Sequence, residues 1–190
     1  MIDSTFQEAL EDSPIIAAIK DDDGLERCIS SDSKIIFILY GDILNIPSIV
    51  QKVKDAGKIA MVHIDLIQGL HNNKDISVDW MRKHTAADGI ISTKSNLIQR
   101  AQELGFYTVM RFFVIDSMAY DNIRRQVRNV RPDVVEILPA LMPKVIRRIC
   151  ANLKTPLIAG GLVSDKEDVM ACLEAGAACI SSTNQEVWFL

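Results

Sequence analysis

The chain repeats one pattern from Ile15 to Ile180, in which short apolar runs alternate with segments of helical periodicity. The runs are only a few residues long and rich in Ile and Val, which is typical of buried parallel strands. The expected strands are Ile15–Ile19, Ile35–Tyr40, Ile59–Ile64, Gly89–Ile91, Thr108–Ile115, Val134–Leu138, Leu157–Ala159 and Ala178–Ile180.

Helical segments separate these strands, so the chain is built from βα units. The expected helices cover residues 23–29, 44–56, 78–86, 95–104, 118–129, 141–152 and 165–175. Alternating units predict a parallel sheet, and eight of them predict closure into a compact (β/α)8 TIM-type barrel. An open doubly wound sheet is the alternative, but no GxGxxG fingerprint follows the first strand.

Two further segments have expected places in this barrel. Ser4 and Gln7 form a capping-box pattern before an amphipathic stretch with Phe6 and Leu10, which is suited to cover the lower mouth. The connection over residues 66–77 is unusually long, which favours a lid or an interface on the functional face. In the helix expected over 44–56, Leu44 lies on the apolar face.

Composition restricts the class of protein. At 190 residues and 48% hydrophobic, the chain is expected to form a single domain over residues 1–190. No apolar run reaches the ~18 residues of a membrane span, and the N-terminus lacks a signal-peptide pattern. The four cysteines show no CxxC pair, so they are expected to be reduced packing residues. These features predict a cytoplasmic protein with no membrane partner, and they are compatible with a homo-oligomer.

Residues 157–183, which read LIAGGLVSDKEDVMACLEAGAACISST, carry the strongest functional pattern. Loops after strands seven and eight of such barrels commonly bind phosphate. Glycines let backbone N–H groups approach an oxyanion, and a following helix N-terminus adds positive charge. The alternative is a tight turn and a helix cap. The predicted phosphate-binding residues are Gly160, Gly161, Ser181, Ser182 and Thr183.

Polar residues at other strand ends are expected to complete this site, because such ends converge in a barrel. Lys20 and Arg111 are suited to neutralise a phosphate or a substrate oxygen. Glu136 and Asp65 are suited to accept hydrogen bonds from hydroxyl groups. The four residues predict a polyol-binding region, so the expected ligand is a small phosphorylated polyol.

No clear catalytic or metal-binding pattern accompanies these residues. The HxD spacing should place His63 and Asp65 on one side of a strand, yet a histidine bonded to a carboxylate is favoured over a metal ligand. Lys94 is favoured as a solvated residue over a Schiff-base lysine. Serine-nucleophile, P-loop and zincin motifs are absent from the sequence. We therefore predict no catalytic residue, no metal and no other cofactor.

Charge is distributed unevenly along the chain, although the net charge is only −4. Residues 122–154 hold eight basic side chains against Asp133 and Glu136, and several recur at helical spacing. Such a stripe has the electrostatic character of a nucleic-acid contact, and the alternative is an ordinary solvated helix face. The candidate contact residues are Arg124, Arg125, Arg128, Arg147 and Arg148.

The sequence resembles the glycerol-3-phosphate-responsive antiterminators, which are RNA-binding regulators of glycerol-use operons. The resemblance covers nearly the whole chain and ends with Trp188. The matching segments are SPIIAAIKDDDGL, IFILYGDILNI, MVHIDLIQGL, DGIISTKS, RFFVIDS, PDVVEILPAL, IAGGLV and AGAACISST.

The resemblance implies a TIM-type barrel, glycerol 3-phosphate as effector and leader mRNA as partner. The alternative class is a sugar-phosphate isomerase or aldolase, whose barrels use the same phosphate loops, and fold alone does not separate the two. The basic stripe favours the regulator, because an enzyme for a very small substrate has no use for it.

Overall fold

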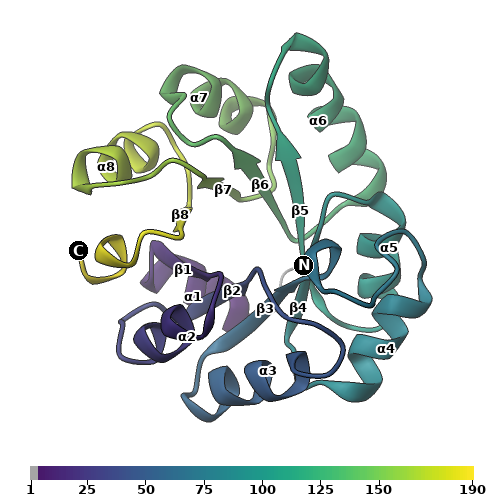
Figure 1. Ribbon diagram of the computed structural model, residues 1–190. Helices are drawn as coiled ribbons and strands as arrows, with labels where there is room; N and C mark the ends of the chain where they lie inside the picture. Colours follow the sequence, from purple (N-terminus) through teal and green to yellow (C-terminus); the bar gives the residue numbers. More distant parts are fainter. Residues whose placement is uncertain (1–3) are drawn as a thin grey trace.

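The computed structural model describes residues 4–190, which form a closed barrel of eight parallel strands in sequence order (Figure 1). The strands are β1 (Ile15–Ile19), β2 (Ile35–Ile38), β3 (Ile59–His63), β4 (Gly89–Ser92), β5 (Tyr107–Phe113), β6 (Val134–Leu138), β7 (Leu157–Gly160) and β8 (Cys179–Ser182). The predicted (β/α)8 barrel is confirmed.

Helices surround the barrel and follow the predicted alternation. They are α1 (Ser4–Asp12), α2 (Asp22–Ile29), α3 (Ile46–Asp55), α4 (Ile76–His84), α5 (Ser95–Glu103), α6 (Ser117–Val130), α7 (Pro143–Asn152) and α8 (Lys166–Glu174). Two 3-10 turns, η1 (Ile64–Leu66) and η2 (Gln185–Phe189), follow β3 and β8. Within residues 4–190, no helix is long and apolar enough to cross a bilayer.

The strands bury both faces, as near-continuous apolar runs require. Successive side chains alternate between the barrel interior and the helices. Interior positions such as Val109, Val134, Ile158 and Cys179 form one buried cluster. The neighbouring positions of the same strands, such as Met110, pack in a second cluster with the surrounding helices. This alternation decides which strand-end residues face the central cavity.

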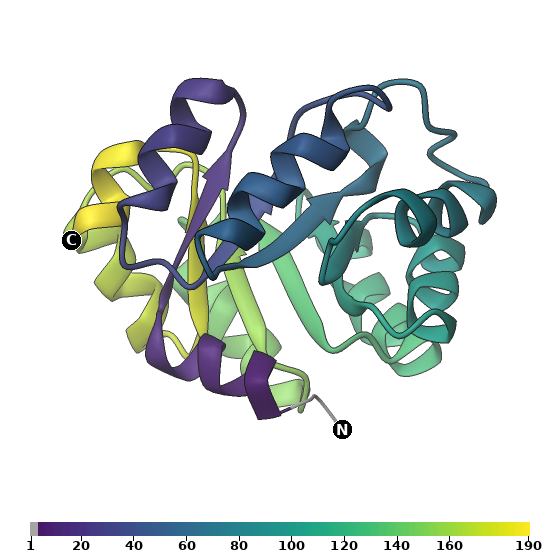
Figure 2. The same cartoon turned by 90° about the horizontal axis from the view of Figure 1, so that it is seen from below.

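Helix α1 closes one end of the barrel, as its position before β1 predicted. Phe6 is fully buried with Ala9 and Leu10 among the interior side chains, and its ring stacks on Tyr107 at 4.5 Å. Figure 2 shows α1 at the end opposite to the loops that follow the strands. Among residues 4–190, α1 therefore covers this end of the barrel, and the interior opens toward the carboxyl-terminal loops.

Several predicted helix boundaries are wrong by one or two residues, and the start of α3 is one of them. The helix expected over 44–56 begins at Ile46, and Leu44 lies before it with 86% of its surface exposed. The Asp42 carboxylate accepts hydrogen bonds from the backbone N–H groups of Leu44 and Asn45, which holds a turn there. Pro47 then occupies the first helical turn, where its fixed φ is favourable.

The long connection over residues 66–77 is joined to the loop after β2. Gln68 pairs with Asp42 in a parallel bridge, and its N–H donates to the Gly41 carbonyl at 3.0 Å. The Ser77 hydroxyl donates to the His71 carbonyl. These bonds brace the connection against the mouth of the barrel.

The cysteines are free, as their spacing predicted. Cys28 and Cys179 are buried, and burial raises the pKa of their thiols to about 11 and about 12. Thiols with such pKa values remain protonated at neutral pH, which agrees with a packing role.

Candidate functional site

A layer of polar side chains lies above the apolar barrel interior. Arg111, Glu136 and Ser181 each follow an inward-facing residue two positions earlier on the same strand, namely Val109, Val134 and Cys179. The register places Arg111 opposite Glu136 on β5 and β6. Sequence alternation thus carries these three side chains to the open end of the barrel.

Glu136 is the centre of this layer. The side chain is fully buried, and its two oxygens accept hydrogen bonds from Arg111 Nε at 2.5 Å and Ser181 Oγ at 2.6 Å. The Arg111 side chain is 7% exposed, so the ion pair is almost removed from water. A buried carboxylate needs such partners, because an unpaired buried charge is costly.

Gly160 makes room for this arrangement. A Cβ at that position would lie 2.4 Å from Ser181 Oγ and 2.8 Å from Glu136 Oε1, which no real side chain tolerates. The absence of a side chain on β7 therefore lets Glu136 and Ser181 meet.

The loop after β7 has an unusual backbone. Gly161 and Leu162 have φ angles of +79° and +65°, and Leu162 is 70% exposed. A positive φ is uncommon for a residue with a side chain and often marks a functional site. Successive turn residues of this kind can aim their N–H groups at an anion.

Several N–H groups around this loop are unoccupied. Among residues 4–190, no partner is found for the backbone N–H groups of Leu162, Val163 and Thr183. The N-terminus of α8, which the sequence suggested as a source of positive charge, is already capped. Asp165 accepts from Asp168 N at 2.9 Å, and Asp168 accepts from Ser164 N at 2.9 Å. The free donors of residues that line the cavity are therefore those of the two loops.

These features surround one cavity of about 410 Å³, a size typical of small-ligand sites. Five of the predicted site residues besides Glu136 line its walls with Leu162, Val163 and Asn184. The five are Arg111, Gly161, Ser181, Ser182 and Thr183. The Ser182 hydroxyl donates to the Val163 carbonyl at 2.9 Å, so this side chain supports the loop.

Three predicted residues, Gly160, Lys20 and Asp65, are not part of this cavity wall. Gly160 lies behind it, at the contact between Glu136 and Ser181. Lys20 is exposed immediately after β1. Asp65 lies in η1, because β3 ends at His63, and the expected strand alternation between the two residues is lost. Its carboxylate accepts from Ser92 Oγ at 2.6 Å and from Thr93 N at 2.9 Å. Asp65 therefore braces the loop after β4.

His63 is buried at the end of β3, and the expected hydrogen bond to a carboxylate is not formed. Its Nδ1 is buried and has no partner among the described residues. Burial, and then the neighbouring Arg111 charge, lower the pKa of His63 to about 4. The imidazole is neutral at neutral pH, so Arg111 carries the positive charge of this layer.

No metal centre is evident here. Within the described part of the chain, no three His, Cys, Asp or Glu side chains are grouped so that they could hold a metal ion.

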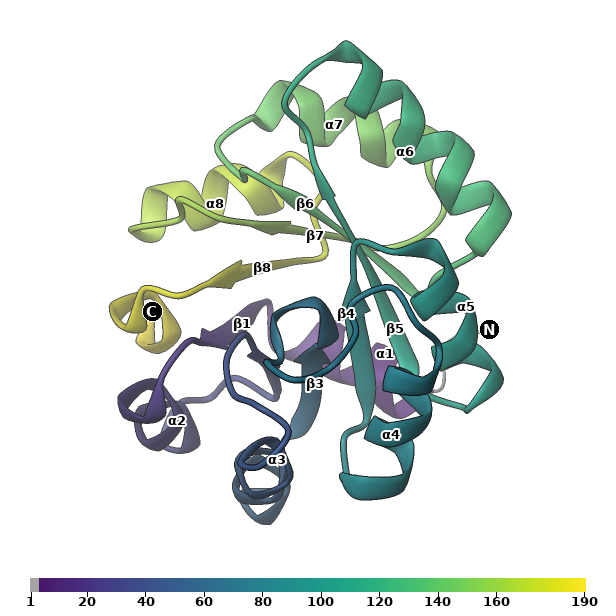
Figure 3. The same cartoon turned by 45° about the vertical axis from the view of Figure 1, so that its right-hand side comes forward.

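The candidate nucleic-acid residues lie on the outer surface. All five arginines are exposed, three on α6 and two on α7. These helices lie side by side on the barrel wall (Figures 1 and 3). They follow β5 and β6, the strands that carry Arg111 and Glu136.

Residues 15–188 match the family described as Glycerol-3-phosphate responsive antiterminator. The chain belongs to this family. The match spans both the polar layer and the arginine-bearing helices, so both lie within the part shared with other antiterminators.

Similar proteins share nearly the whole barrel. The Escherichia coli (strain K12) protein YgcP is 44% identical over 181 residues, which cover 95% of this chain and 94% of YgcP. The glycerol uptake operon antiterminator regulatory protein of Listeria monocytogenes is 30% identical, with a TM-score of 0.87, and 92% of this chain and 94% of that one are covered.

A second antiterminator structure is similar to this chain over nearly its whole length. The glycerol uptake operon antiterminator-related protein of Thermotoga maritima is 33% identical, with a TM-score of 0.81. The likeness covers 93% of this chain and 98% of that one.

Sequence reasoning missed the backbone of Leu162 and Val163 and the side chain of Asn184. Asn184 lines the cavity and caps η2 by accepting from Glu186 N at 3.1 Å. The missed signal was the position of these residues, each within three residues of the end of a strand that had been assigned to the site.

Proposed function

We propose that this chain is a transcription antiterminator that binds glycerol 3-phosphate and the leader mRNA of a glycerol-use operon. The observation that carries the proposal is the barrel cavity itself, with a buried Arg111–Glu136–Ser181 unit at its inner wall and unoccupied loop N–H groups at its rim. The protein would act in the cytoplasm, where leader transcripts are made.

In this proposal the phosphate lies against the loops after β7 and β8. Gly161 and Thr183 line that end of the cavity, and Ser181 and Ser182 hold the loops in position through their hydrogen bonds. Gly160 keeps the space open. The backbone N–H groups of Leu162, Val163 and Thr183 supply donors to the oxyanion.

The hydroxyl groups of the effector then face the inner wall. Arg111 uses only Nε toward Glu136, so its terminal nitrogens remain as donors. Glu136 accepts from the effector and holds Arg111 in place. Lys20 adds positive charge at the rim, and Asp65 contributes by bracing the neighbouring loop.

The RNA surface in this proposal is the outer face of α6 and α7. Its phosphate contacts come from Arg124, Arg125, Arg128, Arg147 and Arg148, which are all exposed. An arginine fork suits phosphate oxygens, and several of them on adjacent helices suit a folded transcript.

Charge reversal tests this surface. The double variant Arg124→Glu with Arg147→Glu should bind leader RNA more weakly, and the salt slope should fall by about 0.7–0.9 for each lost contact. Binding is measured by titration at several salt concentrations. The matched control is Arg82→Glu with Lys83→Glu on α4, two exposed cations on another helix. If the double variant binds RNA with the same affinity and the same salt slope as the parent, the arginines form an ordinary solvated helix face.

The proposal assigns no catalytic activity to the cavity. Lys94 is exposed, and Glu136 is held in an ion pair with the buried Arg111. Pure protein incubated with glycerol 3-phosphate or triose phosphates should therefore leave them unchanged, as followed by NMR. Conversion that disappears in a Glu136 or Lys94 variant would instead support the isomerase or aldolase alternative.

A further inference from the structure

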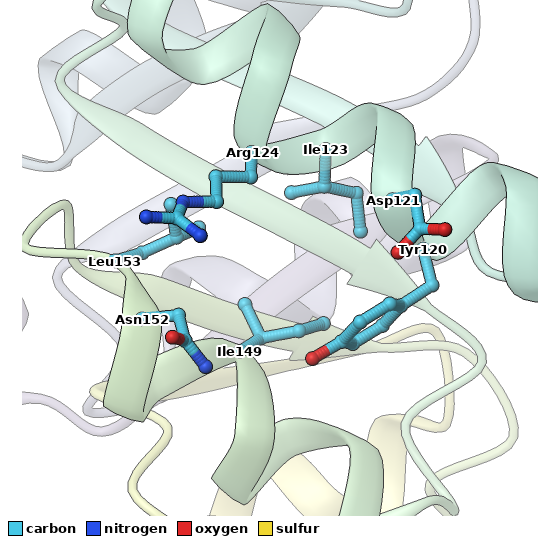
Figure 4. Close-up of a pocket in the computed structure, with 7 residues that line it drawn as sticks. All are labelled: Tyr120, Asp121, Ile123, Arg124, Ile149, Asn152 and Leu153. Atoms are coloured by element: carbon cyan, nitrogen blue, oxygen red, sulfur yellow. The ribbon is translucent and has the colours of Figure 1, made fainter.

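A groove runs between α6 and α7 on the surface that carries the arginines (Figure 4). It consists of two cavities, of about 310 and 160 Å³, which share Tyr120 as a lining residue. The larger begins at the loop after β5, and the smaller ends at Asn152 and Leu153. Tyr120 therefore lies where the two cavities adjoin.

The groove combines an aromatic face with unused polar groups. Tyr120 and Arg124 point from α6 toward α7, and Ile149 and Asn152 face them from the other side (Figure 4). The Arg124 side chain makes no ion pair or hydrogen bond within residues 4–190, although it lines the cavity. Asn152 donates through Nδ2 to the Arg148 carbonyl at 2.7 Å, which leaves its Oδ1 as an acceptor.

Cations outnumber carboxylates around the groove, which favours an anionic occupant. Arg124 and Arg148 line the two cavities, and Arg147 and Lys144 border a further hollow on α7. The carboxylates are Asp121 in the smaller cavity and Asp116 in the larger, where Asp116 caps α6 by accepting from Ala119 N. A negatively charged polymer fits this combination if it also carries planar groups with hydrogen-bonding edges, because the cations, the aromatic ring and the amide would each have a partner.

We propose that this groove binds an unpaired nucleotide of the RNA, with the base against Tyr120 and the flanking phosphates on Arg124 and Arg148. This inference rests on the proposed RNA-binding function and adds to it that the RNA is recognised through a single-stranded segment. Proteins read unpaired RNA in this way, because a splayed base can stack on an aromatic ring while its edge meets polar groups. A paired base offers no free face to the ring.

The test compares two substitutions of Tyr120, using a mixed-sequence 12-nucleotide single-stranded RNA and the leader transcript as probes. Tyr120→Leu keeps apolar packing against the core but removes the ring face, and Tyr120→Phe keeps the face. Tyr120→Leu should lower affinity by about tenfold, the order expected for one lost base–aromatic stack, with an unchanged salt slope. Tyr120→Phe should bind like the parent.

Three outcomes would overturn the inference, and each has a distinct pattern. Tyr120→Leu could bind RNA like the parent while the Arg124→Glu with Arg147→Glu variant binds more weakly. This result would support the RNA function and exclude the base site. No binding of either probe by the parent at low salt would remove the RNA function and the base site together. A change in sedimentation of Tyr120→Leu with unchanged RNA affinity would make the groove a protein interface.

Discussion

Gly161→Asp should abolish the binding of glycerol 3-phosphate without unfolding the barrel. Gly161 lines the cavity where the phosphate is proposed to lie, and its φ of +79° is a conformation that side chains rarely adopt. An aspartate there sets a negative charge against a phosphate at short range. Two like charges about 4 Å apart cost roughly 4 kcal/mol at an effective dielectric constant of 20, which corresponds to about a thousandfold in affinity.

The matched control is Gly57→Asp. Gly57 has a similar φ of +73°, lies after α3, and has no heavy atom within 4 Å of an added Cβ. Both variants therefore carry a similar backbone strain, although an added Cβ at Gly161 also lies 3.3 Å from Leu138 Cδ2. Only Gly161→Asp places a carboxylate in the cavity. Calorimetry should find normal binding for Gly57→Asp and none for Gly161→Asp. Normal binding by a folded Gly161→Asp protein would show that the phosphate lies elsewhere.

Glu136→Gln should weaken effector binding by ten- to a hundredfold and also destabilise the protein. The loss of a hydrogen bond with a charged partner costs about 1.5–3 kcal/mol, which sets the expected change in affinity. The substitution also leaves Arg111 as a buried charge without its counterion, and breaking a buried pair costs about 3–5 kcal/mol of unfolding free energy. Calorimetry and chemical denaturation measure the two effects separately.

Glu103→Gln provides the comparison for stability. Glu103 pairs with Arg100 on α5, and its side chain is 63% exposed, so its loss should cost less than about 1 kcal/mol. If Glu136→Gln is as stable as Glu103→Gln and binds effector normally, Glu136 neither holds Arg111 nor contacts the hydroxyl groups.

Much of the barrel is predictable, because each strand is an apolar run and three helices are followed by a glycine, namely Gly57, Gly105 and Gly176. Gly105 illustrates this: it follows α5 with a φ of +73°, the left-handed conformation that a C-terminal glycine favours. The inward positions of Arg111 and Glu136 also follow from strand alternation, once the strands are known. These features depend on local patterns.

The remaining features depend on contacts between distant segments. The position of Asp65 is decided by Ser92 and Thr93, which only the folded barrel brings to it. The requirement for Gly160 comes from a side chain on β6 and another on β8. The positive φ of Leu162 has no sequence signal, because leucine does not favour that conformation.

Hydrogen bonds connect the proposed effector cavity to α6 and α7, the helices proposed to face the RNA. Ala140 N donates to the Gly161 carbonyl at 3.1 Å, and Ala140 lies in the loop that leads to α7. Val114 N, in the loop that leads to α6, donates to the Leu138 carbonyl at 2.8 Å. A ligand that orders the Gly161 loop can therefore bias both helices. Linkage then requires that effector and RNA change each other's affinity by the same factor.

The decisive measurement is a titration of leader RNA with and without saturating glycerol 3-phosphate, on the parent and on Gly161→Asp. The parent should bind RNA with an affinity that changes with effector, by the same factor by which RNA changes the affinity for effector. The RNA affinity of Gly161→Asp should be the same with and without the effector. Equal RNA affinity of the parent under both conditions, with effector binding shown by calorimetry, would contradict an effector-responsive antiterminator.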